Sequence, residues 1–205
     1  MMKRTYECIA RRMGVMVLQA LFVVTVAAQT DYDMRYTVAF DTLGHYLNVQ
    51  LDYQQNSQVN ELVLNMPRWT PGYYEMLNFP KHLCDFVAED VQGKPLSWKK
   101  DGMNRWRISL PVDGKAHVSY RVYANQRDVA SSRVEGNLAF VAPAGVFMYV
   151  DGQTVHSVTV HFDMPITWEH IATGLVPHKD ERSTFMVKDF YTLYDSPFLL
   201  CNFYV

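Results

Sequence analysis

The sequence is short of cysteine, of clustered positive charge and of long apolar runs. It has three cysteines in 205 residues, charged residues make up 20% of it, and its formal net charge is −2. Beyond the N-terminal region, the only basic run is Lys99–Lys100. A nucleic-acid-binding domain usually carries a clustered basic face, so this composition argues against that class and we expect no nucleic-acid partner.

The sequence also lacks the common catalytic signatures. It contains no HExxH zinc motif, no Gly-x-Ser-x-Gly elbow, no glycine-rich phosphate loop and no Cys-x-x-Cys. His156 and His161 are five residues apart on an expected strand, so they should point to opposite faces and cannot share a metal. His170 and His178 are expected in a loop. We therefore predict no catalytic residue, metal site or cofactor in this chain, and expect surface or edge-strand histidines.

Acidic residues gather after Cys84, at Asp85, Glu89 and Asp90. Such a group could supply the carboxylate pair of a glycosidase, but spacing alone does not identify one. A solvated strand face is the expected explanation.

The N-terminal region differs from the rest of the chain. Its stretch Val15–Ala28 is apolar but too short, and interrupted by Gln19, to span a bilayer comfortably. Four basic residues precede it, at Lys3, Arg4, Arg11 and Arg12. This pattern predicts a signal peptide over residues 1–28, cut near Ala28–Gln29, and export to the periplasm or the medium. The alternative is an uncleaved membrane anchor, although we expect no permanent anchor.

Cys84 and Cys201 are the two cysteines of the expected mature chain. Export would permit a disulfide between them, but nothing in the sequence brings them together. Two unpaired buried thiols are the other possibility, because cysteine behaves as a small hydrophobic residue.

Alternation of apolar and polar residues dominates residues 29–205. In His45–Tyr53 every second residue is apolar, and short segments with the same period recur without intervening helical patterns. We expect strands over Glu61–Met66, Arg105–Leu110, His117–Tyr123, Gly145–Val150 and Val155–Phe162. The only helix candidate, Tyr74–His82, is interrupted by Pro80. The pattern predicts an all-β, antiparallel β-sandwich in a single domain.

One segment does not fit a plain strand: Pro67–Tyr74 has the sequence PRWTPGYY. Pro71 and Gly72 favour a type II turn, which would hold Trp69, Tyr73 and Tyr74 in fixed directions. These residues could form an aromatic corner that plugs one end of the sandwich. They could instead form a rigid platform for a partner or peptide, and we select this loop as the candidate partner-facing site.

The same segment carries a family resemblance. Leu64–Phe86 resembles the signature of the N-terminal domain of the glycyl aminopeptidase family, metallopeptidase family sixty-one, which runs approximately P-x-W-x-P-G-S-Y. Tyr73 replaces the usual Ser, and the loop Ala142–Gly145 also departs from the family pattern. Further similar elements follow in order, at NRWR (104–107), SYRVYAN (119–125), Phe147–Val150, Pro165–Gly174 and YDSP (194–197).

The resemblance implies a β domain that precedes a thermolysin-like zinc catalytic domain, often followed by a PDZ module. No catalytic residue can be carried over, because the family's catalytic motif has no counterpart in this sequence. The resemblance implies a non-catalytic domain that packs on a catalytic domain in cis and shapes access to it, with peptide as the expected substrate. The alternative is a stand-alone secreted module that binds peptide or glycan through its aromatic loop.

The first prediction concerns export. The charges and apolar run of residues 1–28 should direct translocation and leave a mature N-terminus near Gln29. Mass spectrometry of the periplasmic or secreted protein tests this prediction. Intact Met1 on protein from the soluble cytoplasmic fraction would contradict it.

The second prediction concerns metal. The purified protein should bind no stoichiometric zinc and should release no amino acid from aminoacyl substrates, because the zinc ligands of a thermolysin-type site are missing. Metal analysis after dialysis tests the first point. One tightly held zinc ion per chain would show that the protein has a zinc site without that motif.

Overall fold

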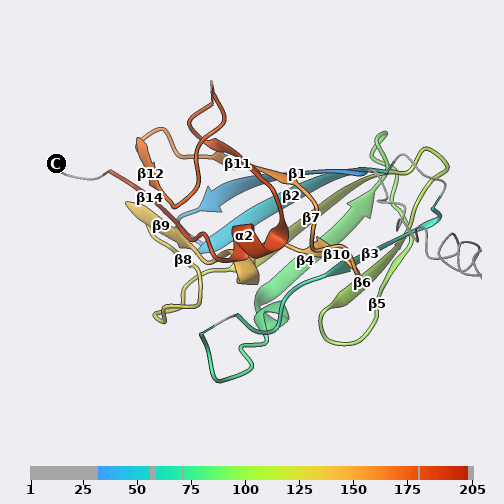
Figure 1. Cartoon of the computed structure of the whole chain (residues 1–205), viewed down its shortest axis with the longest axis horizontal. Coiled ribbons are helices and arrows are strands. Elements are labelled where there is room, and N and C mark those ends of the chain that lie inside the picture. Colours follow the sequence, from blue (N-terminus) through green and yellow to red (C-terminus); the bar gives the residue numbers. More distant parts are fainter. Residues whose placement is uncertain (1–31, 56–58, 71, 180, 203–205) are drawn as a thin grey trace, which may run out of the picture. The chain divides into compact units, whose positions relative to one another are not determined.

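Three sheets make up the fold of the computed structural model, which describes residues 32–55, 59–70, 72–179 and 181–202 (Figure 1). The largest sheet has the order β13-β11-β1-β2-β7-β4, and two four-stranded sheets have the orders β10-β3-β6-β5 and β12-β14-β9-β8. The strands of the large sheet are β1 (Tyr32–Asp41), β2 (Tyr46–Gln55), β4 (Leu83–Glu89), β7 (Lys115–Tyr123), β11 (Val158–Asp163) and β13 (Thr184–Val187). Those of the second sheet are β3 (Glu61–Asn65), β5 (Trp98–Lys100), β6 (Arg105–Ser109) and β10 (Tyr149–Val150). Those of the third are β8 (Arg133–Val134), β9 (Leu138–Val141), β12 (His170–Ala172) and β14 (Phe198–Cys201).

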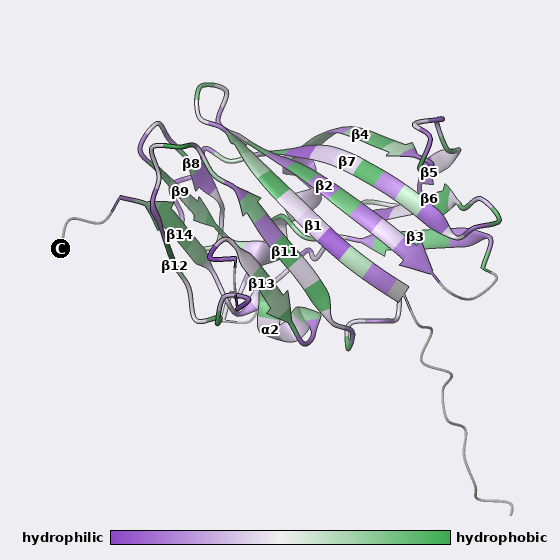
Figure 2. Ribbon diagram, turned by 90° about the horizontal axis from the view of Figure 1, so that it is seen from above, coloured by the Kyte–Doolittle hydropathy of each residue, from purple (hydrophilic) through white to green (hydrophobic). Residues whose placement is uncertain are grey.

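Period-two burial makes one face of the large sheet the wall of the core. In β2 every second side chain from Leu47 to Gln55 is buried, and the polar residues between them lie on the other face. β7 repeats this pattern in register with β2. The alternation of hydropathy along these strands is visible in Figure 2. The all-β sandwich and the alternating strands predicted from sequence are therefore confirmed.

Aromatic contacts join the large sheet to each of the smaller ones. Phe86 of β4 stacks on Trp106 of β6 with ring centroids 5.7 Å apart. Phe162 of β11 meets Phe198 of β14 edge to face at 4.7 Å. Such ring pairs bury large areas in a fixed geometry. The two small sheets consequently cover the same face of the large one, and the core lies between the layers (Figure 2).

One strand pairing departs from the expected antiparallel arrangement. β1 pairs with β2 antiparallel but with β11 parallel, from Arg35 opposite Thr159 to Ala39 opposite Asp163. More than one hundred residues separate these two strands in the sequence, which leaves ample chain for the crossover that a parallel pair needs.

The helical segments are short and only partly predicted. The candidate Tyr74–His82 is helical only at its end, where η1 (Phe79–His82) forms one 3-10 turn that contains Pro80. A five-residue α2 (Phe190–Tyr194) was not predicted. Its first turn is capped by Asp189, whose carboxylate accepts the Thr192 N–H at 2.7 Å.

The strand predicted over Gly145–Val150 is wrong for most of its length. Only β10 pairs there, while η2 (Pro143–Gly145) and the residues up to Met148 cross from β9 to β10 with every side chain buried. We call Ala142–Met148 the crossing segment. Three of its carbonyls accept hydrogen bonds from tyrosine hydroxyls, and not from the backbone of a neighbouring strand. Tyr120 donates to the Val146 carbonyl at 2.7 Å, Tyr194 to that of Phe147 at 3.0 Å and Tyr36 to that of Met148 at 2.6 Å.

The two cysteines are unpaired, so the disulfide left open by the sequence does not form. Cys84 lies on β4 and Cys201 on β14, in different sheets, and both are half-buried instead of fully buried. Within the described residues, no helix is both long and apolar enough to cross a bilayer. The proposed signal peptide, residues 1–28, lies outside the part of the chain that the structure describes.

The third prediction tests the tyrosine bonds to the crossing segment. Tyr120→Phe should lower the free energy of unfolding by roughly 1–3 kcal/mol, because it leaves the buried Val146 carbonyl without its donor. Denaturant titration measures the loss. Tyr191→Phe is the matched control, since Tyr191 is 65% exposed and its change should stay within about 0.5 kcal/mol. Equal stability of the two variants would show that the hydroxyl is dispensable.

Candidate functional site

The aromatic loop follows β3 and is closed by its own backbone. The Arg68 carbonyl accepts the N–H groups of Leu77 and Asn78 at 2.9 and 3.1 Å, which brings the two ends of the loop together. At its tip the Tyr73 N–H donates to the Thr70 carbonyl at 3.3 Å, and Gly72 has a φ of 87°. This is the turn that the sequence predicts around Gly72. Pro71 itself lies outside the described residues.

The rings of this loop are outside the hydrophobic core. Trp69 is 47% exposed, Tyr74 is fully exposed and Tyr73 is half-buried. The Trp69 indole N–H donates to the Tyr73 carbonyl at 2.5 Å, which fixes the ring against the turn. This exposure favours the platform over the plug, and the choice between them stays a prediction. Phe79, which follows the loop in the sequence, is 3% exposed and belongs to the core.

An aromatic groove of about 580 Å³ lies beside the loop. Its rings come from three distant parts of the sequence, namely Trp69 of the loop, Tyr149 of β10, and Tyr191 and Tyr194 of α2. The rings of Tyr149 and Tyr194 meet edge to face at 6.4 Å. Arg68 and Asp195 add one charge of each sign to the lining.

A second hollow of about 320 Å³ lies between the turn of the aromatic loop, η2 and the end of α2. Thr70, Gly72 and Tyr73 line it together with Ala142–Ala144, and it shares Tyr194 and Asp195 with the groove. The fold thus brings together the segments PRWTPGYY, APAG and YDSP, which are separated by up to 130 residues. We call the set Trp69, Tyr73, Tyr149, Tyr191 and Tyr194 the aromatic face.

Two phenols of the aromatic face, those of Tyr149 and Tyr194, have raised pKa values and are therefore uncharged at neutral pH. Burial raises the pKa of Tyr194 well above its usual value, and its hydroxyl donates to the Phe147 carbonyl. Burial, and then the charge of Asp151, raises the pKa of Tyr149. A protonated phenol cannot act as a general base. Besides its rings, the groove is lined by Pro67, Thr154 and one charged residue of each sign.

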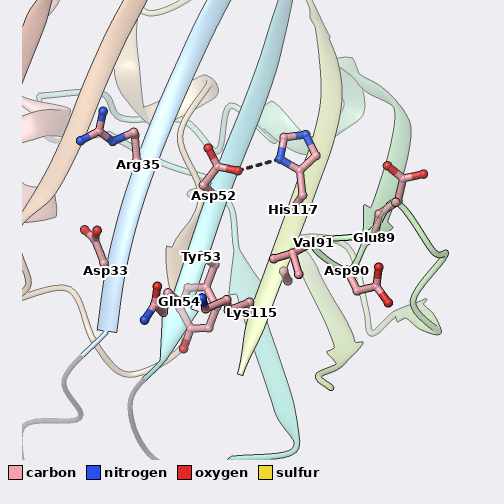
Figure 3. Close-up of a pocket in the computed structure, with 12 residues that line it drawn as sticks. Asp33, Arg35, Asp52, Tyr53, Gln54, Glu89, Asp90, Val91, Lys115 and His117 are labelled. Atoms are coloured by element: carbon pink, nitrogen blue, oxygen red, sulfur yellow. Dashed lines mark hydrogen bonds and ion pairs between the residues drawn. The ribbon is translucent and has the colours of Figure 1, made fainter. Parts of the chain in front are cut away.

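A third hollow, of about 570 Å³, lies on the outer face of the large sheet (Figure 3). Its lining is polar and comes from β1, β2, β7 and the end of β4. The His117 Nδ1 and an oxygen of Asp52 lie 2.7 Å apart, as Figure 3 shows. No serine, threonine or cysteine nucleophile lines the hollow within the described residues. This region is a polar sheet face on which His117 and Asp52 are hydrogen-bonded.

The candidate histidines are scattered. His156 precedes β11 and only His161 lies on it, so the expectation that both share one strand is wrong. His161 is bonded through Nδ1 to the Thr184 hydroxyl at 2.7 Å. His170 lies on β12, and His178 faces Glu181 in an isolated bridge. Among the described residues no three His, Cys, Asp or Glu side chains could hold a metal ion. The described residues therefore do not fit a zinc site, and the absence of zinc from the protein stays a prediction.

Two of the acidic residues after Cys84, Asp85 and Asp90, have structural roles. Asp85 pairs with Arg121 of β7 at 3.3 Å. Asp90 closes the following turn, where its carboxylate accepts the N–H groups of Gln92 and Lys94 at 2.9 Å each. Neither arrangement resembles a catalytic carboxylate pair.

Sequence reasoning identified the loop but missed the other rings beside it. Tyr191 and Tyr194 belong to the unpredicted α2. The Asp189 cap could have indicated this helix, but five residues are too few to show helical periodicity. Nothing in the sequence places β10 or α2 beside the loop, because that contact depends on the crossing segment.

Comparison with known proteins identifies a matching family and similar structures. Residues 35–202 match the family described as the peptidase M61 N-terminal domain. A solved aminopeptidase N family protein from Idiomarina loihiensis has a TM-score of 0.74 and 28% identity, over 82% of this chain and 29% of that protein. Aminopeptidase A from Legionella pneumophila, solved with aspartic acid, has a TM-score of 0.49 and 12% identity, over 85% of this chain and 22% of the other. No curated protein sequence matches.

The matched region extends from β1 to the end of β14 and covers nearly all of the described residues. The chain also spans less than a third of the length of the Idiomarina protein. The resemblance seen in the sequence motifs is thereby confirmed: this chain belongs to the peptidase M61 N-terminal domain family.

Proposed function

We propose that this domain packs through its aromatic face on a metallopeptidase catalytic domain and shapes which peptide ends reach that domain's active site. The observation that carries the proposal is the exposure of fixed rings. Trp69 is 47% exposed and is bonded to the Tyr73 carbonyl, on a loop that is closed by backbone bonds and lies in the segment that resembles the family signature. Exposed aromatic clusters on rigid supports are typical of interaction sites.

The shape of the aromatic face supports the same proposal. Two adjoining hollows of about 580 and 320 Å³ could receive side chains or a short segment of a partner. Because Trp69 is held by its bond to the Tyr73 carbonyl, little side-chain entropy remains to be lost on association. Zinc and the catalytic groups would belong to the partner domain.

We further propose that the protein acts outside the cytoplasm, in the periplasm or the medium. The charged and apolar pattern of residues 1–28 supports this proposal. The two unpaired thiols do not bear on it, since an exported protein need not contain a disulfide.

A second candidate function is a stand-alone module that binds peptide or glycan. The observation in its favour is the groove itself, which is within the size range of small-ligand sites and has aromatic walls with one cation and one carboxylate. The two functions differ in what must occupy the groove: a catalytic domain in the first and a soluble ligand in the second.

The fourth prediction tests docking. Tyr73→Ala and Trp69→Ala should weaken association with a thermolysin-like catalytic domain of this family, supplied as a separate chain, by about 30-fold or more, as expected for an anchor contributing about 2 kcal/mol. Their melting temperatures should change little, because these rings are outside the core. Calorimetric titration and thermal unfolding measure the two effects.

Trp98→Ala is the matched control, because Trp98 is 40% exposed and lies on β5, away from the aromatic face. It should leave association unchanged. A large fall in melting temperature for both loop variants would place the rings in a structural role. Normal docking by both variants would favour the binding module, which peptide or glycan titration would then test.

A further inference from the structure

A fourth hollow, of about 330 Å³, lies where the base of the aromatic loop meets the turn between β5 and β6. Three cations line it, Arg68, Lys81 and Lys100, together with Asn78, Pro80 and Met103. These cations are 13 and 19 residues apart in the sequence, so they do not form one basic run. The fold alone brings them together.

Local bonds orient the first of these cations. The Arg68 Nε donates to the side-chain oxygen of Asn78 at 2.9 Å, and its backbone carbonyl closes the aromatic loop. The backbone carbonyl of Asn78 accepts a hydrogen bond from the Lys81 N–H at 3.0 Å. Because the Arg68 bond uses Nε, the two terminal guanidinium nitrogens remain available. Together they can donate two parallel hydrogen bonds to one carboxylate.

The positive charge of this hollow is not neutralised. Among the described residues, no carboxylate lies within ion-pair distance of the three cations, and no acidic residue lines the hollow. Asp101 follows Lys100 in the chain but pairs with Arg105 at 3.7 Å and Arg107 at 2.8 Å. The Lys100 ammonium instead lies 4.9 Å from the centre of the Trp106 ring.

We propose that this hollow binds a carboxylate carried on an apolar stem, the chemistry of a peptide C-terminus. The cations supply the charge complement, while Pro80 and the 58% exposed Met103 supply an apolar wall. The volume, about 330 Å³, is at the lower end of the size range of small-ligand sites. This proposal does not depend on docking to a catalytic domain.

Titration of the isotope-labelled protein by NMR tests the proposal. N-acetyl-leucine should shift the backbone amides of Asn78, Lys81 and Gly102 in a saturable way, and higher salt should weaken the binding. N-acetyl-leucine amide, which has the same stem without the charge, should bind at least tenfold more weakly. Equal binding of acid and amide would overturn the proposal.

Variants locate the site. Lys81→Met and Lys100→Met keep an apolar stem at exposed positions, and each should weaken N-acetyl-leucine binding by about tenfold, as expected for one charged hydrogen bond. Lys99→Met is the matched control, because Lys99 is the adjacent strand residue and does not line the hollow. Unchanged affinity in both test variants, or an equal loss in the control, would overturn the assignment.

Two further probes identify the ligand. Inorganic phosphate should bind more weakly than N-acetyl-leucine, because it cannot use the apolar wall. N-acetyl-aspartate amide should also bind more weakly, since its carboxylate has only a short stem. Tighter phosphate binding would overturn the carboxylate assignment, and tighter binding of the aspartate compound would overturn the C-terminal one in favour of an acidic side chain.

Discussion

Much of this fold depends on satisfying the backbone of the buried crossing segment, Ala142–Met148. A buried carbonyl without a donor costs about 1–3 kcal/mol, and this segment has no neighbouring strand to supply one between η2 and β10. Three tyrosine hydroxyls fill that need, from Tyr36 of β1, Tyr120 of β7 and Tyr194 of α2. These bonds fasten the chain that links the second and third sheets to the inner face of the large one.

The same constraint determines where the aromatic face lies. The crossing segment leads directly into β10, which pairs with β3, so Tyr149 comes to rest beside the loop that leaves β3. The Tyr194 hydroxyl donates to the Phe147 carbonyl of the crossing segment, and this bond holds the end of α2 at the same place. Gly145 permits the close approach of η2 to η1, because a Cβ there would lie 2.9 Å from the ring of Phe79. The face is therefore built from loops, but the core holds them.

The extent to which the sequence predicts the structure follows from how local each signal is. Strands such as β2 and β7 bury one face, so their alternation is visible in the sequence, and the turn at Gly72 has its own residue signature. The crossing segment is buried on all sides and its apolar run resembles a strand, while its partners are side chains 26 to 112 residues away. Contacts between distant loops, such as Trp69 beside α2, carry no local signal.

Arg68 borders both the aromatic groove and the basic hollow. Its carbonyl closes the loop that carries Trp69. Since its Nε is already bonded to Asn78, the guanidinium cannot turn far without breaking the bond that orients it. An anion held in the hollow would further restrain this side chain. Because the same residue borders the groove, a ligand in the hollow and a partner in the groove would both lie against this one oriented side chain.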